Sequence, residues 1–552
     1  QRNAYIIQLK DKNGGEYSFS NPSAYLSSRA IERRFRQKIP LDSGDLPVSR
    51  PYLDSIRAAG NLDIHAVLKW QNEVCIRTAD LSVLEKIRQF PFVKNIVSID
   101  RQHGLLTERS VNRTAITAIL PKNSPAVSGG FAKGRSPAHS STMLSYGNSF
   151  DQIHIHRGEY LHDQGFLGQG MLIAVLDAGF FQYKTNPAFD SLRLQNRVVA
   201  EWDFVRNEAS VNEDHSHGMI CLSLMASHLP GVLIGSAPAA AYLLLRTEDT
   251  GMEMPIEEYN WAAAAEYADS AGADMISSSL GYINFDDPAY NHSYSQRDGR
   301  TTVITRAANK AAGKGILVMC SAGNDGAADN DLKFVACPAD GDSVLAVGAV
   351  NSKGIIAAFS DWGPNAAGKI KPDVVSVGEN AFYTLPTGTP AQASGTSLAN
   401  PNLAGLVACL WQAFPEFTNM EIMEALRQSA HKHSTPDGRY GYGIPDFKIA
   451  SGLLVRQRSD RAAQSILGSA PIKAYPVPFK SHINLLIEPG MTGPATVRLI
   501  DMAGRLIKDE KTSLNPDGYT YFRFTGLDRL SRGVYIVHFK NSQYNVCFKL
   551  IK

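Results

Sequence analysis

Short apolar runs that end in polar side chains constrain the fold of this chain more than any other feature. Residues 171–176 form one such run, which Asp177 follows, and residues 316–320 form another, which leads through small residues to Asn324. Continuous apolar runs of this length are typical of strands buried on both faces of a parallel sheet. Segments with helical periodicity alternate with these runs, at residues 256–270, 301–312, 401–412 and 419–429. This alternation predicts an α/β domain with a doubly wound parallel sheet.

The polar residues beside these runs could supply catalytic groups. A carboxylate such as Asp177, at the carboxyl end of a buried strand, lies where α/β sheets place ligands. The amide of Asn324 could donate to a developing oxyanion, and His217 stands where a polar stretch turns into an apolar helix. Each residue also has an ordinary structural explanation, because aspartates cap helices, loop histidines lie on surfaces and Gly-Asn-Asp-Gly favours a turn.

Ser397 lies at the predicted start of a helix, within the segment Gly-Thr-Ser-Leu-Ala-Asn-Pro of residues 395–401. The first backbone N–H groups of a helix have no partner within it, and the helix dipole favours negative charge there. A serine at this place could attack a carbonyl carbon while its own N–H stabilises the oxyanion, although serine also caps helices for structural reasons. The chain order Asp177, His217, Ser397 is one of the known orders of a Ser-His-Asp triad.

Four segments of the chain resemble the motifs of the subtilisin-like serine proteases, the subtilases. They read Asp177-Ala178-Gly179, Ser216-His217-Gly218, Ala322-Gly323-Asn324 and Gly395-Thr396-Ser397-Leu398-Ala399-Asn400-Pro401. Further matches, such as residues 343–350 and 359–364, extend the resemblance over residues 146–455. The resemblance implies a serine endopeptidase that acts on proteins or peptides. In it, Asp177, His217 and Ser397 would form the triad, and Asn324 would complete the oxyanion hole.

The resemblance also implies which residues bind substrate. Ser279, Leu280 and Gly281 resemble an edge strand that pairs with the substrate backbone, and Ser321, Ala322 and Gly323 would line the pocket for the P1 side chain. A loop at residues 336–338 would complete that pocket. No charged residue stands clearly at its base, so we expect an uncharged or apolar P1 side chain. No cofactor is required by this chemistry. Structural calcium is left open, with no ligands assigned.

Two positions depart from the family pattern beside the triad. Ala178 stands where Ser or Thr is usual, so one hydrogen bond near Asp177 is expected to be missing. Met219 and Ile220 replace the usual Thr-His after the histidine motif. Because both changes lie beside the triad and not in it, we expect an active enzyme.

Length and charge limit the other classes of function. At 552 residues the chain is expected to hold roughly two to four domains. A net charge of +2 gives no electrostatic affinity for nucleic acid, and no apolar stretch is long enough for a transmembrane segment. The six cysteines include no close pair, which favours buried free thiols over disulfides or a metal site.

Residues 1–104 are predicted to form an α+β domain that resembles subtilase pro-domains, which inhibit their own protease. An unrelated accessory domain is the alternative. Its basic helix, at residues 27–38, is interpreted as a solvated surface helix because Glu32 lies among its arginines. Residues 105–145 are rich in Ser, Gly, Ala and Pro, so we expect an exposed linker with the processing site. N-terminal sequencing of the active species would locate the cut.

After a polar linker at residues 456–470, residues 471–552 are predicted to form a small β-sandwich of short alternating strands. Tyr475-Pro476-Val477-Pro478-Phe479 and the basic end of the chain resemble the C-terminal sorting domain of the type IX secretion system. A carbohydrate- or partner-binding module is the alternative. The resemblance implies contact with secretion machinery and a protein secreted to, or displayed on, the outer surface of a Gram-negative bacterium.

Two competing functions remain at the level of sequence. A surface adhesin built on an inactive subtilase scaffold would not need the four intact residues Asp177, His217, Asn324 and Ser397. An α/β-hydrolase esterase would need Gly-x-Ser-x-Gly around its nucleophile, but Ala399 occupies the last glycine position, and the order of the triad is also wrong for it.

Overall fold

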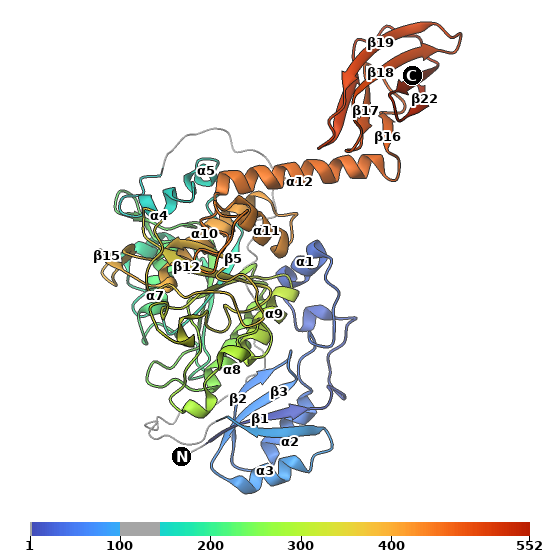
Figure 1. The fold of residues 1–552 in the computed structure, drawn as a ribbon. Coiled ribbons are helices and arrows are strands. Elements are labelled where there is room, and N and C mark those ends of the chain that lie inside the picture. The colour runs from blue at the N-terminus through green and yellow to red at the C-terminus, as the bar shows by residue number, and fades with distance from the viewer. Residues whose placement is uncertain (1–2, 100–143) are drawn as a thin grey trace. The chain divides into compact units, whose positions relative to one another are not determined.

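A seven-stranded parallel sheet with strand order β13-β12-β11-β10-β5-β9-β6 lies at the centre of the first of two units of the chain (Figure 1). The computed structural model describes residues 3–99 and 144–552, and its two units are Gln1–Ser451 and Gly452–Lys552. The strands are β5 (Leu172–Asp177), β6 (Val198–Asp203), β9 (Ala241–Arg246), β10 (Met275–Ser278), β11 (Leu317–Ser321), β12 (Val344–Val350) and β13 (Val374–Val377).

Helices cover both faces of this sheet. On one face, α8 (Ile256–Ala271) and α9 (Val303–Gly313) share an apolar core with Leu172, Ala174 and Leu176 of β5. On the other face, α7 (His217–Ala226) packs against α10 (Thr396–Ala413), which also contacts β10 to β13. The predicted doubly wound α/β sheet is therefore confirmed.

Shorter elements complete this domain around the sheet. They are α4 (Phe150–His154), α5 (Glu159–His162), α6 (Asp190–Leu194), β7 (His228–Leu229), β8 (Leu233–Ile234), β14 (Ala381–Thr384), β15 (Pro390–Ala393) and α11 (Asn419–Ser429). Five of the six cysteines are buried and all six are free, as the sequence predicts.

The N-terminal region of the same unit is an antiparallel sheet with strand order β2-β3-β1-β4 and two helices on one face. Its elements are β1 (Asn3–Leu9), α1 (Ser28–Gln37), α2 (Arg50–Ala58), β2 (Asp63–Leu68), β3 (Glu73–Thr78), α3 (Leu81–Arg88) and β4 (Val93–Ser98). The other face of the sheet packs on α8, because Ile6, Leu68 and Cys75 belong to the same core cluster as Tyr259. Figure 1 shows β2 beside α8.

The interpretation of α1 as a solvated helix is wrong. Arg33 and Arg34 are only 1% and 3% exposed, and both guanidinium groups pair with Asp269 at the end of α8. Charge runs are solvated when no partner covers them. Here the partner carboxylate lies more than 230 residues away in the chain, where local sequence gives no sign of it.

A helix occupies most of the predicted second linker. The sequence predicts a polar linker at residues 456–470, but α12 runs over Phe447–Leu467. Residues 453–467 contain no Gly or Pro and are rich in Arg, Gln and Ala, which favour helix, and Gly468 follows with a positive φ of 62°. The domain boundaries stay predictions, and residues 105–143 of the predicted processing linker lie outside the described residues.

The second unit holds two antiparallel sheets, with strand orders β16-β17-β20 and β19-β18-β21-β22, that share one apolar core. The strands are β16 (Ile472–Tyr475), β17 (Ile483–Ile487), β18 (Pro494–Asp501), β19 (Leu506–Ser513), β20 (Thr520–Phe524), β21 (Val534–Lys540) and β22 (Asn545–Ile551). The predicted sandwich is confirmed, although β16 and β19 were not predicted. Half of the residues of strand β19 are charged, and it pairs only with β18, so its sequence lacks the apolar alternation of an inner strand.

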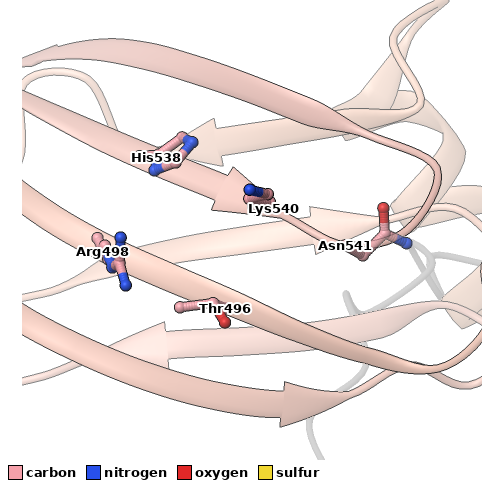
Figure 2. A pocket seen from close by; sticks show the side chains of 5 residues that line it. All are labelled: Thr496, Arg498, His538, Lys540 and Asn541. Carbon is pink, nitrogen blue, oxygen red and sulfur yellow. The ribbon is translucent and has the colours of Figure 1, made fainter.

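A polar hollow of about 350 Å³ lies on the larger sheet of this unit. Figure 2 shows the side chains that line it on β18, on β21 and just after β21: Thr496, Arg498, His538, Lys540 and Asn541. None of the catalytic or substrate-binding residues predicted from the sequence lies in this unit. Within the described part of the chain, no helix is apolar over a sufficient length to span a membrane.

Candidate active site

The end of β5 and the start of α7 bring Asp177 and His217 together. His217 Nδ1 lies 2.7 Å from Asp177 Oδ1, and this carboxylate is fully buried. The close approach depends on Gly218, because a Cβ there would lie 2.8 Å from the Cβ of Asp177 and 2.6 Å from the carbonyl oxygen of Gly179. The predicted aspartate and histidine are therefore a hydrogen-bonded pair.

One oxygen of Asp177 has no partner among the described residues. Its Oδ1 accepts the His217 contact and a 2.7 Å bond from the backbone N–H of Ala178, whereas the buried Oδ2 accepts none. A serine or threonine hydroxyl at position 178 could have supplied a bond in this region, as the sequence departure suggests. Ala178 instead donates only through its backbone.

The charge of Asp177 controls the protonation of His217. The attraction of the carboxylate for an imidazolium raises the pKa of His217 well above 6.5, and this attraction outweighs the burial of the ring, which acts in the opposite direction. Because Nδ1 faces the carboxylate, a neutral His217 carries its proton on Nδ1 and leaves Nε2 free to accept one. Nε2 of His217, on the side of the ring opposite the Asp177 carboxylate, is therefore the basic atom of this site.

Ser397 occupies the first turn of α10, directly after Gly395 and Thr396. Its carbonyl oxygen accepts two side-chain hydrogen bonds, a 2.9 Å bond from Ser279 Oγ and a 3.3 Å bond from Cys221 Sγ. These bonds join α10 to α7 and to the end of β10. They fix the backbone that carries the Ser397 hydroxyl.

Asn324 follows β11 and is held against the start of α10. Its Oδ1 accepts a 2.8 Å bond from the backbone N–H of Thr396 and a 3.0 Å bond from the Thr396 hydroxyl. Because the oxygen is engaged in this way, the Nδ2 group is the free donor of the side chain, and the residue is exposed. The backbone N–H of Ser397 and Nδ2 of Asn324 are therefore the two donors expected at an oxyanion site.

The structure brings the four predicted residues to one edge of the sheet but does not join all of them by hydrogen bonds. Bonds connect Asp177 with His217 and Asn324 with Thr396, the neighbour of Ser397. Among the described contacts, none joins the Ser397 hydroxyl to the His217 ring. The thiol of Cys221 lies between the two elements, 3.9 Å from His217 Nδ1.

The predicted substrate-binding residues flank this edge. Ser279, Leu280 and Gly281 follow β10, which is a central strand, so the expected edge strand is instead a short segment outside the named strands. Ser321 ends β11, and Ala322 and Gly323 follow it. The loop expected to complete the P1 pocket lies against both segments. The Ala336 N–H donates to the carbonyl of Ala322, and Cys337 forms a bridge with Tyr282.

Two residues hold the site in ways that were not predicted from the sequence: Cys221 donates to the Ser397 carbonyl, and Thr396 donates to Asn324. Cys221 lies four residues after His217 on one helix, a spacing that places both side chains on the same face. That spacing could have indicated the contact. In the described ranges 3–99 and 144–552, the only compact set of possible metal ligands consists of Asp177, His217 and Cys221. Asp177 and His217 already form the hydrogen-bonded pair described above. A calcium site stays unassigned.

Comparison with known proteins identifies this arrangement. The profile described as "Subtilase family" matches residues 168–443, which is half of the chain. The chain belongs to the subtilase family. Subtilisin from Bacillus pumilus is 31% identical over 297 residues, which cover 53% of this chain and 94% of that protein. Subtilisin E from Bacillus subtilis (strain 168) is 31% identical over 297 residues, covering 53% of this chain and 68% of the relative. Subtilisin Savinase from Lederbergia lenta is 27% identical over 294 residues, which cover 52% of this chain and 94% of that protein.

This subtilase carries a second and a third family segment on either side of its protease domain. Residues 4–115 match "Peptidase S8 propeptide domain, Bacteroidota", and residues 473–552 match "Secretion system C-terminal sorting domain". The protein is a serine endopeptidase of the subtilisin family with an N-terminal propeptide and a C-terminal sorting domain. The predicted resemblances of both flanking regions are confirmed.

Proposed function

We propose that this subtilase hydrolyses peptide bonds with Ser397 as nucleophile, His217 as general base and Asp177 as the group that orients the base. Ser397 Oγ attacks the carbonyl carbon of the substrate while Nε2 of His217 takes its proton. Asp177 keeps the proton of the neutral ring on Nδ1 and stabilises the imidazolium that forms. The oxyanion accepts hydrogen bonds from the Ser397 N–H and from Nδ2 of Asn324.

The second half of the reaction uses the same groups. His217 gives its proton to the leaving amine, and the acyl group remains on Ser397 as an ester. A water molecule then loses a proton to His217 and attacks this ester, which releases the acid and restores the serine hydroxyl. No step requires a cofactor.

The observation that carries this proposal is the 2.7 Å contact between His217 and Asp177 beside the first turn of α10. The missing bond between Ser397 and His217 does not contradict it, because catalytic hydrogen bonds are commonly long in unliganded enzymes and tighten when substrate binds. Ser397 needs only a rotation about its Cα–Cβ bond to change the direction of its hydroxyl.

A fluorophosphonate probe tests the proposal directly. The probe phosphonylates only an activated serine, so it is expected to label the processed enzyme at Ser397 and to leave a Ser397→Ala variant unlabelled. An inactive scaffold with an adhesive function would react in neither form. Mass spectrometry of the labelled peptide identifies the residue.

The pH dependence of kcat/KM reports the pKa of His217. Catalysis needs the neutral ring, so activity is low below the pKa and rises as pH increases through it. Because Asp177 raises this pKa well above 6.5, we expect less than half of the maximal kcat/KM at pH 6.5. An Asp177→Asn variant should show its acid limb at lower pH and a plateau about 10⁴-fold lower. A wild-type limb at or below pH 6.5 would contradict the assignment.

The walls of the P1 pocket support a preference for uncharged or apolar side chains. The segments Ser321 to Gly323 and Ala336 to Cys337 that flank it contribute no charged side chain. Cleavage of a peptide library by the processed enzyme, read by mass spectrometry, should show few Lys, Arg, Asp or Glu residues at P1. A strict preference for Arg or Lys would refute this expectation.

We further propose that the protein is made as a zymogen whose propeptide inhibits it until the linker is cut, and that it acts on extracellular proteins or peptides. The propeptide packs on α8 and supports the first part, and the sorting domain supports export through secretion machinery. The same domain supports a final location in the medium or on the outer surface of a Gram-negative cell.

A further inference from the structure

Asp361 is a fully buried carboxyl group that the proposed mechanism does not use. It lies in the loop of residues 351–362 after β12. The sequence analysis matched residues 359–364 to the family and gave them no role in the site. Its Oδ1 accepts a 2.6 Å hydrogen bond from the backbone N–H of Asp325. Its own backbone N–H donates to the carbonyl oxygen of Gly323 at 3.2 Å. The two residues on either side of Asn324 are thus both bonded to Asp361.

The surrounding contacts show that this attachment is close and specific. Gly323 has a φ of 120°, and a Cβ there would lie 1.9 Å from Asp361 Oδ2, so only glycine allows the carboxyl group to approach. Beyond Asn324, the N–H of Gly326 donates to the carbonyl of Phe359, and Nε1 of Trp362 donates to the carbonyl of Gly326. Phe359, Asp361 and Trp362 therefore hold residues 323–326, while Thr396 holds the side chain of Asn324.

We propose that Asp361 is the positioning residue that aims the amide of Asn324 at the oxyanion, a role that rests on the function proposed above. An oxyanion donor works only when its direction is fixed before the charge develops. The side chain of Asn324 is exposed, and its hydrogen bonds among the described contacts come from Thr396 alone, so its direction also depends on the backbone that carries it. Asp361 fixes that backbone at the residues immediately before and after Asn324.

The protonation state of Asp361 gives this role a signature in the pH profile. Burial raises the pKa of Asp361 to about 9, although the hydrogen bond from the Asp325 N–H acts in the opposite direction. The carboxylate of Asp325 adds to the rise, and Arg297 and Arg439 oppose it. The group is therefore neutral below about pH 9. Above about pH 9 its ionisation places a negative charge behind Asn324, which opposes the oxyanion, so kcat is expected to fall.

Two substitutions in the processed enzyme test the role. Asp361→Ala removes the acceptor for the Asp325 N–H and is expected to lower kcat about 10- to 100-fold, with KM changed less than about twofold, because loss of an oxyanion donor costs about 10²–10³ in kcat. Asp361→Asn keeps an acceptor oxygen but cannot ionise. It should retain kcat within about threefold at pH 8 and lose the alkaline fall near pH 9.

A double-mutant cycle separates positioning from general stability. In an Asn324→Ala background the donor is already absent, so Asp361→Ala should lower kcat by less than about threefold further. Ser360→Ala is the matched control: Ser360 is equally buried, and among the described contacts its hydroxyl accepts a 3.0 Å bond from the Ala349 N–H and forms no hydrogen bond with residues 323–326. This variant should leave kcat and its pH profile unchanged.

Several results would overturn the proposal. One is that Asp361→Ala lowers kcat by the same factor with and without Asn324→Ala. The others are an unchanged kcat in Asp361→Ala, or a fall in kcat near pH 9 that persists in Asp361→Asn. If Asp361→Ala does not fold, as thermal unfolding would show, the pH profile of Asp361→Asn still decides. Failure of the proposed function is recognised separately, since the wild-type enzyme would then fail to react with a fluorophosphonate.

Discussion

Replacing Ser397 with alanine is expected to lower kcat about 10⁶-fold, the size of loss that removal of the triad serine or histidine causes in subtilisin itself. The hydroxyl lies in the first turn of α10, where a backbone N–H can stabilise the product of its attack. The measurement is hydrolysis of a casein-like substrate, followed by mass spectrometry of both enzyme and products. The same variant should also leave the propeptide uncut.

A second set of variants shows whether Ser397 and His217 act as one unit. His217→Ala should cause about the same loss as Ser397→Ala, and the double variant should be no worse than either, because each substitution already removes the nucleophilic step. Multiplicative losses would mean that the two residues act independently. Cleavage of the purified Ser397→Ala chain within its linker would contradict self-processing and indicate another protease.

The sequence predicted the parts of the site that depend on local pattern and chain order. The apolar run before Asp177 predicted β5, and the motif around His217 predicted the start of α7, where their side chains meet. Helix and strand ends likewise indicated Ser397 and Asn324, and the family resemblance then implied their roles. These features are encoded within a few residues of each other, so they can be predicted without coordinates.

The parts that were missed depend on contacts between distant segments. Arg33 and Arg34 were interpreted as solvated because Asp269 lies far along the chain. The contact between Asp361 and the residues around Asn324 likewise joins two loops whose separate patterns indicate only turns. A buried charge or carboxyl group has no local signature, since its environment is supplied entirely by tertiary packing.

Buried charges of the protease domain face buried charges of the propeptide where these two regions meet. Asp269 on α8 faces three propeptide cations: Arg33 at 2.5 Å, Arg34 at 2.8 Å and Lys69 at 3.1 Å. Lys314, after α9, faces the propeptide residue Asp45 at 2.8 Å. Although burial alone raises the pKa of Asp269, the three cations lower it below its usual value. Within the described residues, the hydrogen-bond and ion-pair partners of the Asp269 carboxylate all belong to the propeptide.

Asp269→Asn is therefore expected to loosen the propeptide strongly while leaving the mature protease intact. Three buried cations would face a neutral amide, and removal of one partner from a buried ionic group costs about 3–5 kcal/mol. In the full chain carrying Ser397→Ala, amide hydrogen exchange of α1 should become up to about 10²–10³-fold faster, as measured by mass spectrometry. In the active chain, kcat/KM of the processed enzyme should not change, because the substitution removes contacts that exist only while the propeptide is bound.

An exposed pair at the same interface provides the control for this prediction. Lys310 on α9 pairs with Asp42 at 3.1 Å, and both side chains are more than one third exposed, so Lys310→Ala should cost less than about 1 kcal/mol. Exchange in α1 should then change less than about fivefold. Equal effects of the two variants would show that burial of the Asp269 cluster does not hold the propeptide. A loss of kcat/KM in processed Asp269→Asn would show that this carboxylate stabilises the protease domain itself.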